Sequence, residues 1–229
     1  FIAAGRTSPA AAVALLHGWG GNAETLLPLA VPLHRAGFAV LLFDARCHGR
    51  SDEDSFASLP RFAEDLEHAL DWLKQQPEVD PNRLAAVGHS VGAGAALLVA
   101  SRRNDLAAVV SIAAFSHPQN MMRRFLAAKQ VPYLPFGWAI LRYVQHVIGH
   151  RFDAIAPVGT IRKVRCHTLL VHGADDVTVP VAEARAIHAA RTGEHVRLRV
   201  IPGRHDDFGD IESAALELVD FLSLACGSR

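Results

Sequence analysis

Residues 83–92 read RLAAVGHSVG, and this stretch decides how the rest of the chain is interpreted. The apolar run before Gly88 predicts a buried strand, and the Ala-rich run that begins at Val91 predicts a helix. Ser90 therefore stands on a tight turn from strand to helix, where Gly88 and Gly92 remove side chains that would clash. The N–H groups at the start of the helix point toward Ser90 and favour negative charge there. The pattern GxSxG in this context predicts a nucleophilic serine.

A serine hydroxyl is a weak nucleophile, so this interpretation requires a general base and a carboxylate that orients it. Both occur later in the sequence, where predicted strands end. HGADDVTVP (172–180) contains Asp175 and Asp176, and PGRH (202–205) ends in His205. The order along the chain is serine, acid, histidine. Adjacent side chains point in different directions, so only one of the two aspartates is expected to reach the histidine.

The rest of the chain alternates short apolar runs with amphipathic stretches, which is typical of an α/β fold with a mostly parallel central sheet and helices on both faces. The predicted strands are residues 11–17, 38–44, 83–88, 107–113, 167–172 and 196–201, and the predicted helices are 23–36, 58–76, 91–103, 180–192 and 211–225. The interval 114–166 is longer than a simple crossover needs, and its apolar residues recur at helical spacing. It predicts a helical cap inserted into a core formed by residues 1–113 and 167–229.

The composition limits the class of protein. A chain of 229 residues with 50% hydrophobic and 20% charged residues must fold, and one domain is expected. Because 23 Lys and Arg balance 23 Asp and Glu, binding to nucleic acid is disfavoured. The three cysteines are scattered and form no CxxC pair, so a reducing, cytoplasmic location is expected. No apolar run is long enough to span a membrane.

Two further motifs complete a family pattern, HGWG at 17–20 and DARCHGRS at 44–51. With GHSVG and the acid and histidine loops, they make nearly the whole chain resemble the α/β hydrolases, most closely the monoglyceride-lipase and serine-aminopeptidase branch. In that layout the insertion follows the sixth family strand. Two features depart from the pattern: Cys47 stands where the loop usually has glycine, and few residues precede HGWG. We therefore expect native sequence upstream of Phe1.

The resemblance implies a role for each matching residue. Ser90 is the nucleophile, His205 is the general base and then the general acid, and Asp176, rather than Asp175, orients the imidazole. The backbone N–H groups of Trp19 and Val91 form the oxyanion hole.

The implied activity is that of a serine hydrolase that cleaves a carboxylic ester through an acyl-enzyme, with no cofactor and no metal. An amide, peptide or thioester bond is the alternative, because the same triad serves all of these. A non-catalytic binding protein with the hydrolase fold is less expected. We predict a small-molecule acyl substrate in an apolar pocket between the serine and the insertion, with substrate contacts from Trp19, His89, Phe115 and Trp138. The sequence leaves the oligomeric state open.

Two motifs suggest other classes of protein. Residues 92–97 (GAGAAL) begin like a dinucleotide-binding loop, but Leu97 replaces the last small residue and no acidic residue follows about twenty positions later. His146 and His150 have the spacing of zinc ligands, but the glutamate of HExxH is missing. Neither motif outweighs the hydrolase interpretation.

The balanced total charge conceals an uneven distribution. Residues 114–166 carry eight basic residues against Asp153 alone, a net charge of +7, which leaves −7 for the remainder. Together with the apolar residues of the insertion, this charge predicts contact with an anionic membrane or attraction of an anionic or lipid-like substrate. Peripheral membrane association is therefore the alternative to a cytoplasmic location. The other explanation of the charge is salt bridges between cap and core.

Overall fold

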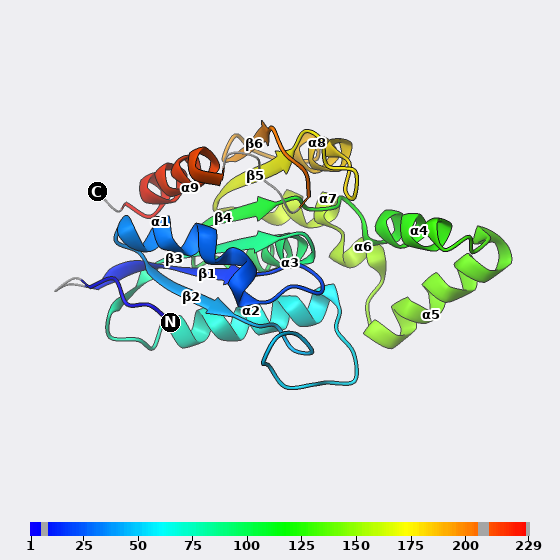
Figure 1. The fold of residues 1–229 in the computed structure, drawn as a ribbon, viewed down its shortest axis with the longest axis horizontal. Coiled ribbons are helices and arrows are strands. Elements are labelled where there is room, and N and C mark those ends of the chain that lie inside the picture. The colour runs from blue at the N-terminus through cyan, green and yellow to red at the C-terminus, as the bar shows by residue number, and fades with distance from the viewer. Residues whose placement is uncertain (6–8, 206–210, 228–229) are drawn as a thin grey trace.

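A six-stranded sheet forms the centre of the computed structural model, which describes residues 1–5, 9–205 and 211–227. The strands are β1 (Ala10–Leu16), β2 (Ala39–Phe43), β3 (Val79–His89), β4 (Leu106–Ile112), β5 (His167–Gly173) and β6 (Val196–Ile201). Their order across the sheet is β2-β1-β3-β4-β5-β6, and all five neighbouring pairs are parallel (Figure 1). The fold class predicted from the sequence is confirmed.

Both faces of this sheet are covered, which explains why its strands are apolar throughout. In β1, Val13 and Leu15 belong to one core cluster with Leu33 of the first helix, while Ala14 and Leu16 belong to the cluster on the other face. The helices are α1 (Leu27–Arg35), α2 (Leu59–Leu73), α3 (Val91–Ala100), α4 (Pro118–Ala128), α5 (Trp138–Ile148), α6 (Phe152–Ile155), α7 (Pro157–Thr160), α8 (Val181–Ala189) and α9 (Ile211–Ala225), with short turns η1 (Ala23–Leu26), η2 (Tyr133–Gly137) and η3 (Ile161–Lys163). Helices α1 and α9 cover one face, and α2, α3 and α8 cover the other.

The element boundaries differ in detail from those predicted. The helix expected over 23–36 begins as the 3-10 turn η1, whose first turn is capped by Asn22 accepting a hydrogen bond from the Glu24 N–H (3.0 Å). Strand β3 begins at Val79, four residues before the predicted start. Helices α2 and α3 each end three residues early, as element ends often do.

The chain between β4 and β5 forms the helices α4, α5, α6 and α7. Helices α4 and α5 with the turn η2 form what we call the helical arm (residues 118–150), which extends beyond the carboxyl ends of the strands (Figure 1). Leu126 and Leu141 are the buried apolar side chains that join the arm to the core cluster. Because parallel strands all end at the same edge, the loops after β3, β5 and β6 meet beside the base of this arm.

Candidate active site

Ser90 lies on the turn between β3 and α3 in a backbone conformation that non-glycine residues rarely adopt, with φ 54° and ψ −114°. A Cβ on Gly88 would stand 2.2 Å from the carbonyl oxygen of Gly92, and a Cβ on Gly92 would stand 2.4 Å from that of His17. The turn therefore requires glycine at both positions. The Ser90 N–H donates to the carbonyl oxygen of Ile112 (2.8 Å), so the neighbouring strand β4 also fixes the turn.

Ser90, His205 and Asp176 form one line of hydrogen-bonded side chains, although they come from three separate loops. His205 Nε2 lies 3.0 Å from Ser90 Oγ, and His205 Nδ1 lies 2.7 Å from Asp176 Oδ2. Because a carboxylate only accepts, Nδ1 carries the proton and Nε2 is left to accept the proton of the serine hydroxyl. This arrangement can activate a serine for attack on a carbonyl carbon.

The aspartate that reaches His205 is Asp176, and its carboxylate is fully buried. Its other oxygen, Oδ1, accepts hydrogen bonds from the N–H groups of Thr178 (2.9 Å) and Val179 (2.8 Å). These bonds fix the carboxylate and compensate its burial. Asp175 is exposed, and its N–H donates to the carbonyl oxygen of Gly203 (3.0 Å), which joins the acid loop to the histidine loop.

His17 anchors the loop HGWG beside the serine. Its Nε2 accepts the Ala45 N–H (3.0 Å), so its Nδ1 carries the proton and donates to the carbonyl oxygen of Gly18 (2.7 Å). Burial lowers the pKa of His17, which keeps it neutral, as these two contacts require. A Cβ on Gly18 would stand 3.1 Å from Ser90 Cβ, so the loop passes directly against the serine.

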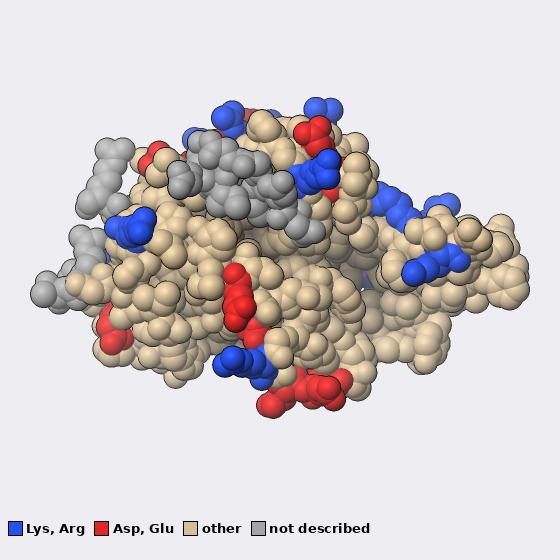
Figure 2. Space-filling model, in the orientation of Figure 1, with Lys and Arg blue, Asp and Glu red and all other residues tan. Residues whose placement is uncertain are grey.

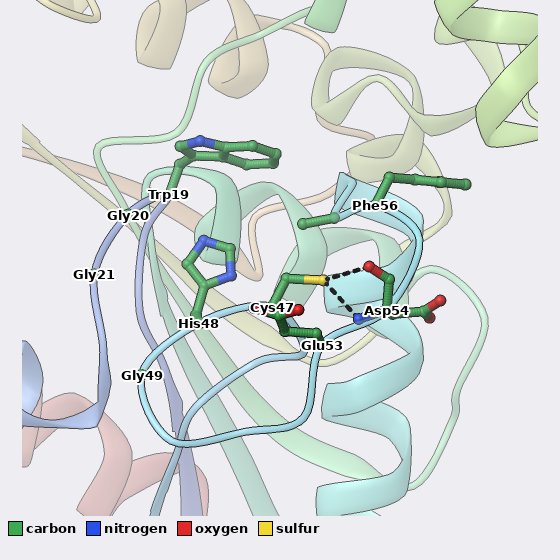
Figure 3. Close-up of a pocket in the computed structure, with 10 residues that line it drawn as sticks. Trp19, Gly20, Gly21, Cys47, His48, Gly49, Glu53, Asp54 and Phe56 are labelled. Atoms are coloured by element: carbon green, nitrogen blue, oxygen red, sulfur yellow. Dashed lines mark hydrogen bonds between the residues drawn. The ribbon is translucent and has the colours of Figure 1, made fainter.

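A cavity of about 580 Å³ opens next to this loop (Figure 3). The loops at 19–21 and 47–57 form it, and its lining is mixed: Trp19, Phe56 and Ala57 are apolar, whereas His48, Glu53 and Asp54 are polar. The side chain of Cys47 also lines it, at the positive φ of 62° where the related loops usually have glycine, and its Sγ accepts the Asp54 N–H (3.2 Å). Trp19 is 64% exposed and stacks on Phe62, so its ring is available at the rim.

The four predicted substrate contacts have different surroundings. Trp19 lines the cavity. Phe115 is buried in the core cluster and Trp138 is exposed on α5, and neither side chain lines that cavity. Phe115, three residues after β4, is buried beside α3, where a Cβ on Gly94 would stand 3.8 Å from its ring. The described cavity is thus formed by the two loops and not by the insertion.

His89 is also buried, and its ring contacts the histidine loop. Its Nε2 lies 2.9 Å from the backbone carbonyl oxygen of His205, and the two imidazole centroids are 5.1 Å apart. A carbonyl oxygen only accepts, so Nε2 of His89 donates. We expect this contact to help position His205, and the substrate contact predicted for His89 from the sequence stays a prediction.

We expect His89→Phe to lower kcat/KM for an activated ester about tenfold, because the ring volume is kept while the bond that positions His205 is lost. His89→Gln retains a donor and should recover part of the activity. The measurement is kcat/KM across pH together with the urea midpoint of unfolding. Equal activity of the Phe variant and the wild type would remove His89 from the positioning role.

Sequence reasoning missed the contacts that join α8 to the start of the arm. Glu183 is buried and accepts hydrogen bonds from the N–H (2.8 Å) and the hydroxyl of Ser116, and from the guanidinium of Arg124 (2.5 Å). Burial acts to raise the pKa of Glu183, but the bonds from Ser116 and Arg124 outweigh it, and the pKa is lowered. The excess of basic residues in the insertion was the available signal that one of them has a buried acidic partner.

We expect Glu183→Gln to lower the free energy of unfolding by about 1–3 kcal/mol, because Arg124 and Ser116 lose a charged acceptor. A lowered carboxyl pKa stabilises the fold above the ordinary value of 4.5, and this contribution is lost as pH falls through the lowered pKa. Urea unfolding at neutral and acidic pH measures both effects. Glu194→Gln, at a side chain that is 95% exposed, is the control and should change stability by less than about 0.5 kcal/mol.

The described residues also bear on two other features, a metal site and a membrane-spanning helix. No group of three or more His, Cys, Asp and Glu side chains is placed there to hold a metal ion, and His146 lies exposed on α5. The described helices also include none that is long and apolar enough to cross a membrane.

The parallel sheet, the serine on its turn from strand to helix, and the acid and histidine loops at the same sheet edge define an α/β hydrolase. More narrowly, the chain belongs to the family described as serine aminopeptidase, S33, whose model matches residues 7–148.

Relatives and solved structures agree with this classification. An uncharacterized protein of Mycobacterium tuberculosis is 31% identical over 201 residues, which cover 86% of this chain and 63% of that protein, so the chain spans less than two thirds of this relative. The esterase Pf2001 of Pyrococcus furiosus superposes with a TM-score of 0.74 at 21% identity, over 94% of this chain and 83% of that one. Est1E of Butyrivibrio proteoclasticus, solved with ferulic acid bound, has a TM-score of 0.80 at 19% identity, over 99% and 94% of the two chains. At these identities the two structures show the shared fold.

Proposed function

We propose that the protein is a serine hydrolase that cleaves a carboxylic ester through an acyl-enzyme. The observation that carries the proposal is the unbroken line from Ser90 Oγ to His205 (3.0 Å) and from His205 to the buried carboxylate of Asp176 (2.7 Å). A glycine-rich turn with an incidental serine has no reason to place a neutral base and an orienting carboxylate in that line. The family to which the chain belongs supports the same chemistry.

In the first half of the reaction, Ser90 Oγ bonds to the carbonyl carbon of the ester while its proton passes to His205 Nε2. The carbonyl oxygen becomes negative, and the backbone N–H groups of Trp19 and Val91 are the donors we assign to it. The Val91 N–H is suited to this because it lies in the first turn of α3, where N–H groups have no partner within the helix. His205 then donates the proton to the departing alcohol, which leaves an ester on Ser90.

In the second half, water attacks the acyl carbon and gives its proton to His205 Nε2. The tetrahedral intermediate collapses, the acid product leaves, and the proton returns to Ser90 Oγ. Asp176 stabilises the imidazolium that forms in both halves. We assign the cavity beside Trp19 to part of the substrate, since its volume of about 580 Å³ falls in the range of small-molecule sites.

A fluorophosphonate probe tests the mechanism, because it labels an activated serine. We expect mass spectrometry to locate the label at Ser90 and labelling to disappear in Ser90→Ala. Label at another residue, or hydrolysis by a wild-type protein that takes no label, would overturn the proposal.

A substrate panel tests the choice of bond and acyl group. It compares the ester, thioester and anilide of one acyl group, and then p-nitrophenyl esters from acetyl to octanoyl. We expect the ester to be preferred and kcat/KM to rise with acyl length. A preference for the thioester or anilide would replace the ester assignment, and equal kcat/KM along the series would contradict an apolar acyl site.

A further inference from the structure

The helical arm has an apolar surface that its own folding does not require. On α5, Leu141 is buried and Val144 and Ile148 are half-buried, and these side chains form the inner face toward the rest of the protein. Four other apolar side chains, Phe136, Ile140, Tyr143 and Val147, follow one another at spacings of four, three and four residues. That spacing places Ile140, Tyr143 and Val147 in one row on α5, with Phe136 just before it in η2, and all four are exposed, with Phe136 at 62% and Tyr143 at 67%.

Two further exposed aromatic rings lie elsewhere on the arm. Trp138 is 53% exposed on α5, and Phe125 is 55% exposed on α4. The part of the chain that the structure describes exposes sixteen large apolar side chains. Six of these are Trp138, Phe125 and the four side chains of the row. A concentration of this kind on one projection marks a surface that contacts something apolar.

The arm carries positive charge and no negative charge. Residues 119–150 contain four Arg and Lys and no Asp or Glu. Arg123, Lys129 and Arg142 are exposed, and the Arg123 guanidinium lies 4.2 Å from the centre of the Tyr133 ring. Figure 2 shows Lys and Arg on the arm, whereas the acidic residues of this view lie on the body. Lys129 lies 6.0 Å from the centre of the Phe125 ring and Arg142 lies 6.0 Å from that of Trp138, so cations accompany the exposed aromatic rings of the arm.

Salt bridges to the body do not account for this charge. Among the described residues, Arg124 is the one cation of the arm paired with a carboxylate, that of Glu183. Four of the eight basic residues of the insertion lie outside the arm: Arg151 pairs with Asp153 (3.8 Å), and Arg162, Lys163 and Arg165 line a separate hollow near Ser101 and His195. The predicted excess of charge is thus divided between two places, and only the cations of the arm accompany exposed aromatic rings.

We propose that this face of the arm contacts the surface of an anionic lipid bilayer. The arm combines this apolar row with exposed Trp and Tyr and with nearby cations, which is what an interfacial helix needs to insert its apolar side chains while its cations attract acidic headgroups. A second copy of the chain fits less well, because two such faces would bring together cations with no carboxylate between them. The arm lies at the carboxyl edge of the sheet, so bilayer contact brings the edge that holds Ser90 toward the lipid.

Vesicle sedimentation tests the proposal with phosphatidylcholine vesicles that contain or lack phosphatidylglycerol. We expect binding only to the anionic vesicles and weaker binding as salt is raised. The charge variant R123Q/K129Q/R142Q should bind at least about tenfold more weakly. The matched control R162Q/K163Q/R165Q removes the same charge from exposed residues outside the arm and should bind within about threefold of the wild type. Phe136→Ser with Tyr143→Ser tests the apolar row and should also weaken binding at least about tenfold.

Several results would overturn the proposal. Equal sedimentation with neutral and anionic vesicles would do so, and so would equal losses in the arm variant and its control. A stable dimer that the Phe136→Ser and Tyr143→Ser changes dissociate would assign the face to a second copy. The urea midpoint of each variant shows that it is folded, and hydrolysis of a soluble acetyl ester should be unchanged in all of them. The binding result is therefore separate from the fate of the esterase proposal.

Discussion

Ser90→Ala is expected to lower kcat for an activated ester by at least about a thousandfold while the protein stays folded. The substitution removes the oxygen that bonds to the acyl carbon. Alanine keeps the Cβ that serine already has, so it adds no new contact at the strained backbone with φ 54°. Ser90 Oγ contacts His205 at the surface of the site, so little buried volume is lost. Initial rates with p-nitrophenyl acetate measure kcat, and the urea midpoint measures stability.

His205→Ala should cost about as much as Ser90→Ala, because the two side chains act as one unit. The double variant should then be scarcely slower than either single variant. Losses that multiplied in the double variant would contradict the mechanism, since they would mean that serine and histidine contribute independently. Full activity in either single variant would remove that residue from the reaction.

The turn around Ser90 was predictable because its requirements are local. Where a strand passes into a helix within one residue, position 88 lies against the Gly92 carbonyl. The glycines in the sequence therefore mark the positions that cannot carry a side chain. The parallel strands were predictable for a similar reason, since both of their faces are apolar. The three residues of the proposed triad followed from these elements, because the loops after parallel strands meet at one edge.

The parts that the sequence could not predict depend on contacts between distant residues. Glu183 meets Ser116 across 67 positions of the chain, and His89 meets the backbone of His205 across 116. Neither contact leaves a periodic pattern in the sequence. The pocket was predicted between the serine and the insertion because aromatic residues are concentrated in the insertion, but periodicity does not tell whether an aromatic ring is buried, like Phe115, or exposed, like Trp138.

The two adjacent aspartates show the same limit at the scale of one residue. Asp175 and Asp176 carry the same charge, and the sequence favoured Asp176 only through the family resemblance, so the physical reason for the choice lies in the three-dimensional path of the loop. The N–H groups of Thr178 and Val179 turn back onto Asp176 Oδ1 and direct Oδ2 toward His205. A matched pair of substitutions at these positions can therefore test the assignment without any change in size.

Asp176→Asn is expected to lower kcat by about a thousandfold or more, whereas Asp175→Asn should change it by less than about threefold. In Asp176→Asn the amide oxygen can still accept from Thr178 and Val179, which leaves the NH₂ group facing His205 Nδ1. That donor favours the imidazole tautomer with its proton on Nε2, and this tautomer cannot accept the proton of Ser90. The exposed side chain of Asp175 is not part of the line, and its backbone bond to Gly203 survives the substitution. Steady-state rates for the two variants decide the matter, and a larger loss in Asp175→Asn would transfer the orienting role to that residue.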